Sequence, residues 1–176
     1  KGKRVGVVGT GASAIQIIPE LVKVAGSVKV FQRTPAWVMP RPDFKRPDWT
    51  KKLFETLPVT QKLIREGLFW GHEAMALALI WDSPLRKVAQ RVALEHLKLQ
   101  VKDTWMRRQL RPDFKIGCKR VLVSNDYYPA LQAPNTELIT WPIAGITETG
   151  VQTAEGLIHE FDALVFATGF DIPKNG

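Results

Sequence analysis

The sequence has 176 residues, of which 45% are hydrophobic, and a formal net charge of +8. This length can bury a core of its own, and the composition is that of an ordinary globular protein. The single cysteine excludes an internal disulfide and favours a reducing compartment, so we expect a cytoplasmic protein. The longest apolar run, residues 74–81, is far shorter than the roughly 20 residues of a membrane-spanning helix, so we expect no transmembrane segment.

The positive charge is unevenly distributed along the chain. Residues 1–40 hold six basic and one acidic side chain, residues 41–120 hold eighteen and nine, and residues 121–176 hold one and seven. Such a basic stretch suits a nucleic acid or membrane surface, a solvated helical face, or an anionic cofactor. We expect a solvated helical face for most of it and no nucleic acid partner.

The beginning of the chain predicts a β-α-β unit. Residues 4–8 form a short apolar run, which is typical of a strand buried in a parallel sheet. Apolar residues at positions compatible with a packed helix follow over 15–25, with Pro19 expected to kink this helix. Residues 28–32 predict a second strand. The fold class we expect is therefore α/β with a parallel sheet.

Helices and further strands follow this unit. Four prolines predict an extended loop over residues 34–47. Residues 48–112 predict three or four helices, one of which begins with Ser83 as N-cap and Pro84 at the first helical position. Later strands are expected over residues 119–123 and 137–140, in a small antiparallel meander over 143–147, 151–153 and 157–159, and over 163–166.

Three expectations concern the packing of these elements. The apolar residues of 88–101 should line one side of a helix, and the aromatic residues of 49–81 should pack in a helical core. Cys118 should be a buried structural thiol. The three histidines lack ligand spacing, so we predict no metal site.

The sharpest local motif is Gly9-Thr10-Gly11-Ala12-Ser13-Ala14, which follows the first strand and opens the helix. In this G-x-G-x-x-A pattern the first glycine permits a tight turn, and the second lets the backbone approach a pyrophosphate. The alanine lets the helix pack closely on the strand, and the helix N-terminus offers free N–H groups to phosphates. The motif predicts a dinucleotide site, and a tight turn without a ligand is the alternative.

The end of the second strand indicates which dinucleotide binds. An NAD or FAD site usually carries an acidic residue there, about 20 residues after the glycines. No acidic residue occurs between positions 28 and 42, and Arg33 stands at the strand end instead. Because arginine can bind a 2′-phosphate through two hydrogen bonds, we expect NADPH at this site rather than NADH or FAD. An exposed arginine without a ligand is the alternative.

Five longer stretches carry a family resemblance. They read VVGTGASAIQ at residues 7–16, FQRTP at 31–35, KIGCKRVL at 115–122, SNDYYPAL at 124–131 and LVFATGF at 164–170. Together they resemble the class B flavoprotein monooxygenases, and within these the Baeyer–Villiger monooxygenases. The stretch with Cys-Lys-Arg and the Tyr-Tyr pair is more specific than the glycine motif.

The resemblance implies a Rossmann-like NADP-binding domain and a reaction. NADPH reduces FAD, the reduced flavin carries dioxygen as a peroxide, and a ketone becomes an ester or lactone. Lys119 would help to hold the 2′-phosphate, and Arg120 would be the catalytic cation that stabilises negative charge near the flavin. The residues expected to bind cofactor are Gly9, Thr10, Gly11, Ala12, Ser13, Gln16, Arg33, Thr34, Lys119, Thr168 and Gly169.

The resemblance also implies that the chain is a fragment. It contains neither a second glycine motif for FAD nor the family signature F-x-G-x-x-x-H-x-x-x-W. We expect residues 1–47 and 113–160 to form the NADP-binding domain, 48–112 a helical insertion, and 161–176 a strand that returns toward an FAD domain of the same polypeptide. Such a fragment should be inactive alone.

Three other functions stay open at this point. The first is an N- or S-oxygenating flavin monooxygenase, which the Lys119-Arg120 pair disfavours. The second is an NADP-binding module without catalysis. The third is a basic binder of nucleic acid or membrane that uses residues 41–120.

Overall fold

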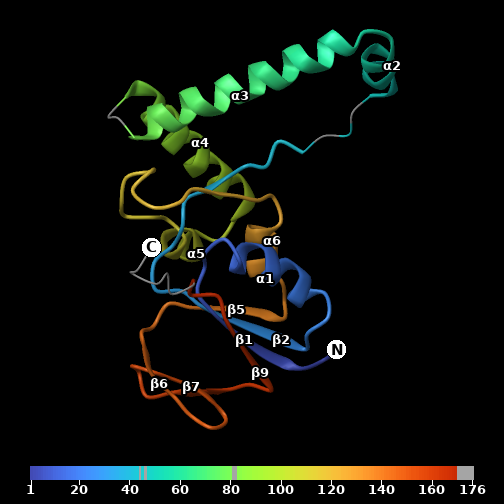
Figure 1. The fold of residues 1–176 in the computed structure, drawn as a ribbon. Helices are drawn as coiled ribbons and strands as arrows, with labels where there is room; N and C mark the ends of the chain where they lie inside the picture. The colour runs from blue at the N-terminus through green and yellow to red at the C-terminus, as the bar shows by residue number, and fades with distance from the viewer. Residues whose placement is uncertain (44, 46, 81–82, 170–176) are drawn as a thin grey trace, which may run out of the picture.

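The computed structural model describes residues 1–43, 45, 47–80 and 83–169. Strands and helices alternate at first, then helices dominate, and strands close the chain (Figure 1). In order, the elements are β1 (Arg4–Val8), α1 (Ala14–Val22), β2 (Ser27–Phe31), β3 (Val38–Met39), α2 (Asp48–Thr56), α3 (Pro58–Ile80), α4 (Pro84–Gln100), α5 (Thr104–Gln109), β4 (Leu122–Val123), α6 (Tyr127–Leu131), β5 (Thr136–Ile139), β6 (Ile143–Ile146), β7 (Gly150–Thr153), β8 (Ile158–Glu160) and β9 (Ala163–Phe166).

A four-stranded parallel sheet is the centre of the structure. Its strand order is β5-β2-β1-β9, and Val5 of β1 lies between Val28 of β2 and Ala163 of β9. The predicted β-α-β unit and the α/β fold class are confirmed. At the start of β1 the Arg4 guanidinium bonds the Asp162 carboxylate at 3.0 Å, and this bond lowers the pKa of that carboxyl.

The two faces of this sheet are covered differently. Helices α1 and α6 pack on one face, where Ile18, Val30 and Leu131 are fully buried. The antiparallel strands β6, β7 and β8 form the predicted meander on the other side of the sheet, and Val151 packs there against Phe31 (Figure 1). The sheet edge that carries the carboxyl ends of its strands stays free of both layers.

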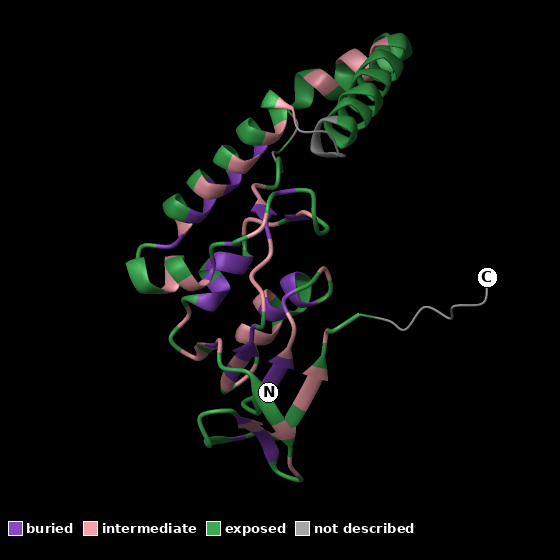
Figure 2. Ribbon diagram, turned by 90° about the vertical axis from the view of Figure 1, so that its left-hand side faces the viewer, coloured by how far each residue is buried: buried purple, intermediate pink, exposed green. Residues whose placement is uncertain are grey.

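The helical insertion packs on the body through α4 and through the segment of α5. The buried side of α4 carries Ala89, Ala93, His96 and Leu97, so its small residues let it lie close to the body (Figure 2). The expected apolar stripe of residues 88–101 is wrong in part, since Val88, Val92 and Leu99 are exposed. The Ser83 cap is confirmed, because its hydroxyl accepts a hydrogen bond from the Arg86 amide at 3.3 Å.

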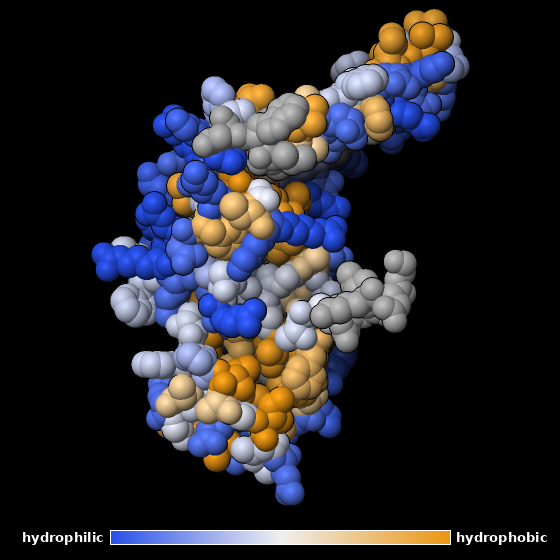
Figure 3. Space-filling view, turned by 60° about the vertical axis from the view of Figure 1, so that its left-hand side comes forward, coloured by the Kyte–Doolittle hydropathy of each residue, from blue (hydrophilic) through white to orange (hydrophobic). Residues whose placement is uncertain are grey.

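Helices α2 and α3 form an arm that extends away from the sheet. Trp49 and Trp70 are each 66% exposed, and Phe69 is 53% exposed. The aromatic residues of this segment therefore do not form the helical core that we expected; Trp81 of the same set lies outside the described residues. Apolar side chains gather at the far end of the arm (Figure 3).

Two features after the insertion differ from the sequence-based expectation. The strand predicted over residues 119–123 is limited to β4, and it pairs with β3 in a separate small sheet rather than with the main sheet. The Trp37 carbonyl accepts the Leu122 amide, which sets this pairing. Helix α6 was not predicted, although the Ser124 hydroxyl accepts the amides of Asp126 and Tyr127 at its start.

In the ranges that the structure describes, no helix is long and apolar enough to cross a membrane.

Candidate nucleotide-binding site

The glycine turn after β1 lies against the ends of β2 and β9. Its first residue, Gly9, has a φ of 106°, and a Cβ atom there would lie 2.6 Å from the Ala167 carbonyl oxygen. The Gly9 amide donates to the Phe31 carbonyl at 3.1 Å, and the Ala167 amide donates to the Val8 carbonyl at 2.8 Å. Only glycine fits this conformation and this space, so the turn is held at the carboxyl edge of the sheet.

The rest of the turn leads into α1 and leaves its N-terminus accessible. Ser13 is the N-cap residue and is exposed, and its side chain makes no capping bond. The Ile15 and Gln16 amides donate to the Gly11 and Ser13 carbonyls at 3.0 and 3.2 Å, so the exposed Ser13 hydroxyl and the amides of the turn are the groups that can meet a phosphate. The Gln16 side chain Nε2 donates to the Ala12 carbonyl at 2.8 Å. This bond supports the turn, so the side-chain amide of Gln16 is not free to bind a ligand.

Thr10 connects the turn to the loop after β2. It is 8% exposed, and its hydroxyl donates to the Thr34 carbonyl at 3.1 Å. Arg33, which precedes Thr34, is exposed and has no hydrogen bond or ion pair with any residue that the structure describes. The structure therefore puts an unpaired guanidinium at the end of β2, close to the glycine turn.

Lys119 and Arg120 approach the same loop from the far end of the insertion. They precede β4, whose Leu122 pairs with Val38 of β3 on the chain that continues from Arg33. Both are exposed, and within the described ranges neither has a carboxylate partner. The Lys119 ammonium lies 4.8 Å from the centre of the Phe114 ring, which holds the side chain while leaving its charge uncompensated.

The end of β9 completes this edge of the sheet. The Thr168 amide lies 3.5 Å from the position of a Cβ on Gly9, so the two strand ends meet. Gly169 follows with a φ of 103° and open space around its Cβ position. Residues 170–176 of the expected return segment lie outside the described residues.

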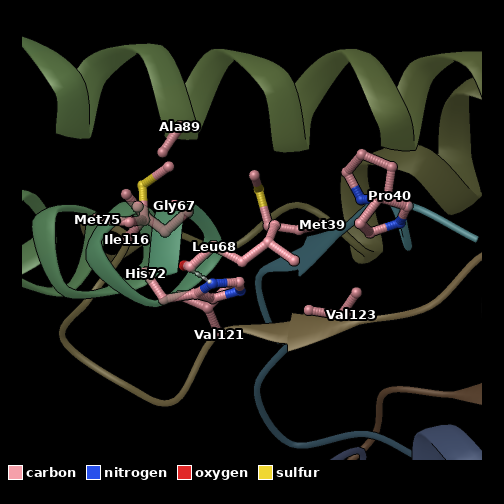
Figure 4. A pocket seen from close by; sticks show the side chains of 12 residues that line it. Met39, Pro40, Gly67, Leu68, His72, Met75, Ala89, Ile116, Val121 and Val123 are labelled. Carbon is pink, nitrogen blue, oxygen red and sulfur yellow. Dashed lines mark hydrogen bonds between the residues drawn. The ribbon is translucent and has the colours of Figure 1, made fainter. Parts of the chain in front are cut away.

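The structure also contains an apolar cavity of about 480 Å³ (Figure 4). It lies between α3, α4 and the small sheet, and Val121, which follows Arg120, is part of its wall. The side chains of Met39, Leu68 and Met75 line it with little polar surface. Sequence reasoning missed this cavity because its walls come from four separate segments that carry no common motif.

The structure also shows the exposure of Cys118 and the arrangement of possible metal ligands. Cys118 is a free, exposed thiol, so the expectation that it is buried is wrong. The turn around Gly117, with its φ of 95°, carries Cys118 to the surface. Among the described residues, no group of three histidine, cysteine, aspartate or glutamate side chains could hold a metal ion.

Comparisons with known proteins show which proteins this chain is similar to. A Baeyer–Villiger monooxygenase of Pseudomonas aeruginosa is 43% identical over 97% of this chain, and one of Streptomyces coelicolor is 40% identical over the same share. The chain is homologous to one part of the Baeyer–Villiger monooxygenases. It spans about a third of the length of these two curated relatives. No family model matches the chain.

Solved structures of Baeyer–Villiger monooxygenases agree with this relationship. An oxidised steroid monooxygenase bound to NADP has a TM-score of 0.76 and 28% identity, and an open cyclohexanone monooxygenase has 0.75 and 25%. Each matches 97% of this chain, which corresponds to 39% and 40% of the solved chains. The resemblance and the fold predicted from the sequence are therefore confirmed.

The two glycines of the turn should respond differently to substitution by alanine. Gly9→Ala should destabilise the protein, because a Cβ would meet the Ala167 carbonyl in a strained backbone region, at a cost of about 1–3 kcal/mol. Gly11→Ala should leave stability nearly unchanged, since a Cβ atom there would lie 3.9 Å from the Ala167 carbonyl oxygen, an ordinary van der Waals distance. It should still weaken binding of NADP⁺ if a pyrophosphate lies against Gly11. Denaturant unfolding and calorimetry measure the two effects, and equal destabilisation by both variants would contradict this geometry.

Proposed function

We propose that this chain is the NADPH-binding part of an NADPH- and FAD-dependent monooxygenase that converts ketones to esters or lactones with dioxygen. One observation supports the proposal: the exposed Arg33 guanidinium at the end of β2 has no partner in the described ranges, and its loop is bonded to the glycine turn through Thr10. Uncompensated cations beside a helix N-terminus favour a ligand with several negative charges.

The residues of this edge fit NADPH. Gly11 is exposed and carries no side chain, so its backbone can approach a pyrophosphate. Arg33, with Thr34 beside it, is in reach of a 2′-phosphate on the adenosine ribose, and Lys119 adds a second positive charge. NADPH supplies a hydride when it is bound. We propose that Ser13, Thr168 and Gly169 border the same dinucleotide and that Thr10 and Gln16 support the turn.

FAD is not assigned to residues of this chain. The described residues contain one glycine turn of the dinucleotide type, and the NADPH proposal uses it. We propose that FAD binds a domain of the same polypeptide outside residues 1–176. From this chain Arg120 supplies a permanent cation, which stabilises an oxyanion that forms near it.

The apolar cavity suits the hydrocarbon part of a ketone. Its volume falls in the range of small-molecule pockets. Val121, which follows the proposed catalytic residue Arg120 in the chain, is part of its wall. The ring of His72 also lies in its wall, with one nitrogen 2.7 Å from the Leu68 carbonyl oxygen. A nonpolar substrate could bury its carbon skeleton here while its carbonyl group faces Arg120.

The organisation of the chain belongs to the same proposal. Residues 1–47 and 113–160 form the NADPH-binding domain, 48–112 the insertion, and 161–176 the connection toward the FAD domain. The cytoplasm is the compartment that the single free thiol favours. Oxygenation of nitrogen or sulfur is the alternative activity, and a full-length protein that oxygenates a sulfide but no ketone would support it.

Arg33→Ala should weaken binding of NADP⁺ by about 10- to 100-fold and binding of NAD⁺ by less than about threefold. The reason is that a charge-assisted pair with a 2′-phosphate is worth about 1.5–3 kcal/mol, and NAD⁺ has no such phosphate. Titration calorimetry of the full-length protein measures both affinities. Arg91→Ala, which removes an exposed arginine from α4, is the control for loss of positive charge. An equal loss for both coenzymes would remove Arg33 from the 2′-phosphate site.

Arg120→Ala should abolish ester formation while binding of NADP⁺ changes by less than about threefold. Loss of a preorganised positive charge near a developing oxyanion costs about 10²–10³ in rate. Product analysis with a cyclic ketone and a coenzyme titration measure the two effects in the full-length protein. Arg120→Lys keeps a charge in a different geometry and should retain part of the rate. Normal ester yield in Arg120→Ala would exclude a catalytic role.

A further inference from the structure

The residue before Arg33 is fixed by two bonds. Gln32 is 4% exposed, and its amide N–H donates to the Ile139 carbonyl at 2.8 Å. Its side chain Nε2 donates to the Gln109 carbonyl, also at 2.8 Å. Both the backbone and the side chain of Gln32 are therefore held at the end of β2.

The partner Gln109 connects this point to two other elements. It is the last residue of α5, and its Nε2 donates to the Thr140 hydroxyl at 3.3 Å. The next residue, Leu110, is 2% exposed and belongs to the main core. A chain of hydrogen bonds thus joins the ends of β2 and β5 to the last helix of the insertion.

Arg33 is held from the other side as well. The Thr34 carbonyl accepts the Thr10 hydroxyl at 3.1 Å, and Thr10 belongs to the glycine turn. The backbone of Arg33 lies between these two fixed residues, whereas its guanidinium is free of partners in the described ranges. A cation on a fixed backbone loses less conformational freedom when it binds an anion.

We propose that Gln32 is a positioning residue for recognition of the 2′-phosphate: its bond to the Gln109 carbonyl fixes Arg33 and ties the insertion to the coenzyme site. This inference rests on the proposed binding of NADPH. Gln32 Oε1 is buried without a partner among the described residues, which costs free energy. A methionine would fill a similar volume without that cost, so packing alone does not account for an amide here.

Gln100 provides a matched control in the same chain. Its Nε2 donates to the Asn125 carbonyl at 3.0 Å, and its Oε1 is also buried without a described partner. It ends α4 and bonds no residue of the glycine turn or of the loop after β2. Loss of either glutamine side chain removes a similar bond, but only Gln32 neighbours Arg33.

The test compares Gln32→Met with Gln100→Met in the full-length protein. Titration calorimetry gives the affinities for NADP⁺ and NAD⁺, and denaturant unfolding gives stability. Gln32→Met should weaken NADP⁺ binding by about 5- to 10-fold and NAD⁺ binding by less than about twofold. Gln100→Met should lower stability to a similar extent and leave the ratio of the two affinities unchanged. An equal loss for both coenzymes in Gln32→Met, or a shift of the ratio in Gln100→Met, would overturn the proposal.

Two further variants separate the possible failures. Gln32→Leu also removes the donor to the Gln109 carbonyl and adds no charge beside Arg33, so it should reproduce the selective loss of NADP⁺ affinity if Gln32→Met does not fold. Arg33→Ala is measured in parallel. If it lowers NADP⁺ affinity selectively and neither Gln32 variant does, the positioning role fails and the coenzyme assignment stands. If Arg33→Ala shows no selectivity, the 2′-phosphate assignment itself fails.

Discussion

The close contact between Gly9 and the end of β9 determines where everything else in the site lies. Because a side chain at Gly9 would meet the Ala167 carbonyl, the turn can sit directly on the carboxyl edge of the sheet. The N-terminus of α1, which follows the turn, then lies at that edge. The loop after β2 is bonded to the turn through Thr10, which brings Arg33 to the same place. A small backbone constraint thus decides the position of a charged site.

The insertion contributes to this site although it lies between distant parts of the sequence. The chain leaves the body after β3 and returns at β4, and the segment that leads into β4 carries Lys119 and Arg120. The Gln32–Gln109 bond attaches α5 at the end of β2. Helix α5, at one end of the insertion, therefore adjoins the proposed coenzyme site. Helices α3 and α4 of the same insertion line the apolar cavity. Binding of coenzyme and of substrate could be linked through this element.

Much of the fold could be predicted from residue patterns, because each pattern had a local physical cause. The run of residues 4–8 forms β1, and the glycine turn follows it as expected. Ser83 caps its helix because its hydroxyl can reach an amide three residues on. The predictions failed where distant segments decide the outcome. Residues 119–121 form no strand because β4 pairs with β3 alone, and the aromatic residues of the arm have no described core to enter.

The central claim is that this edge of the sheet recognises a 2′-phosphate. The most direct measurement is a calorimetric titration of the full-length protein with 2′,5′-ADP and with 5′-AMP, which differ by that phosphate alone. The account predicts that 2′,5′-ADP binds at least about tenfold more tightly, since two cations are free to bind the added phosphate. It also predicts that high salt reduces this difference. Equal affinities for the two nucleotides at low salt would contradict it.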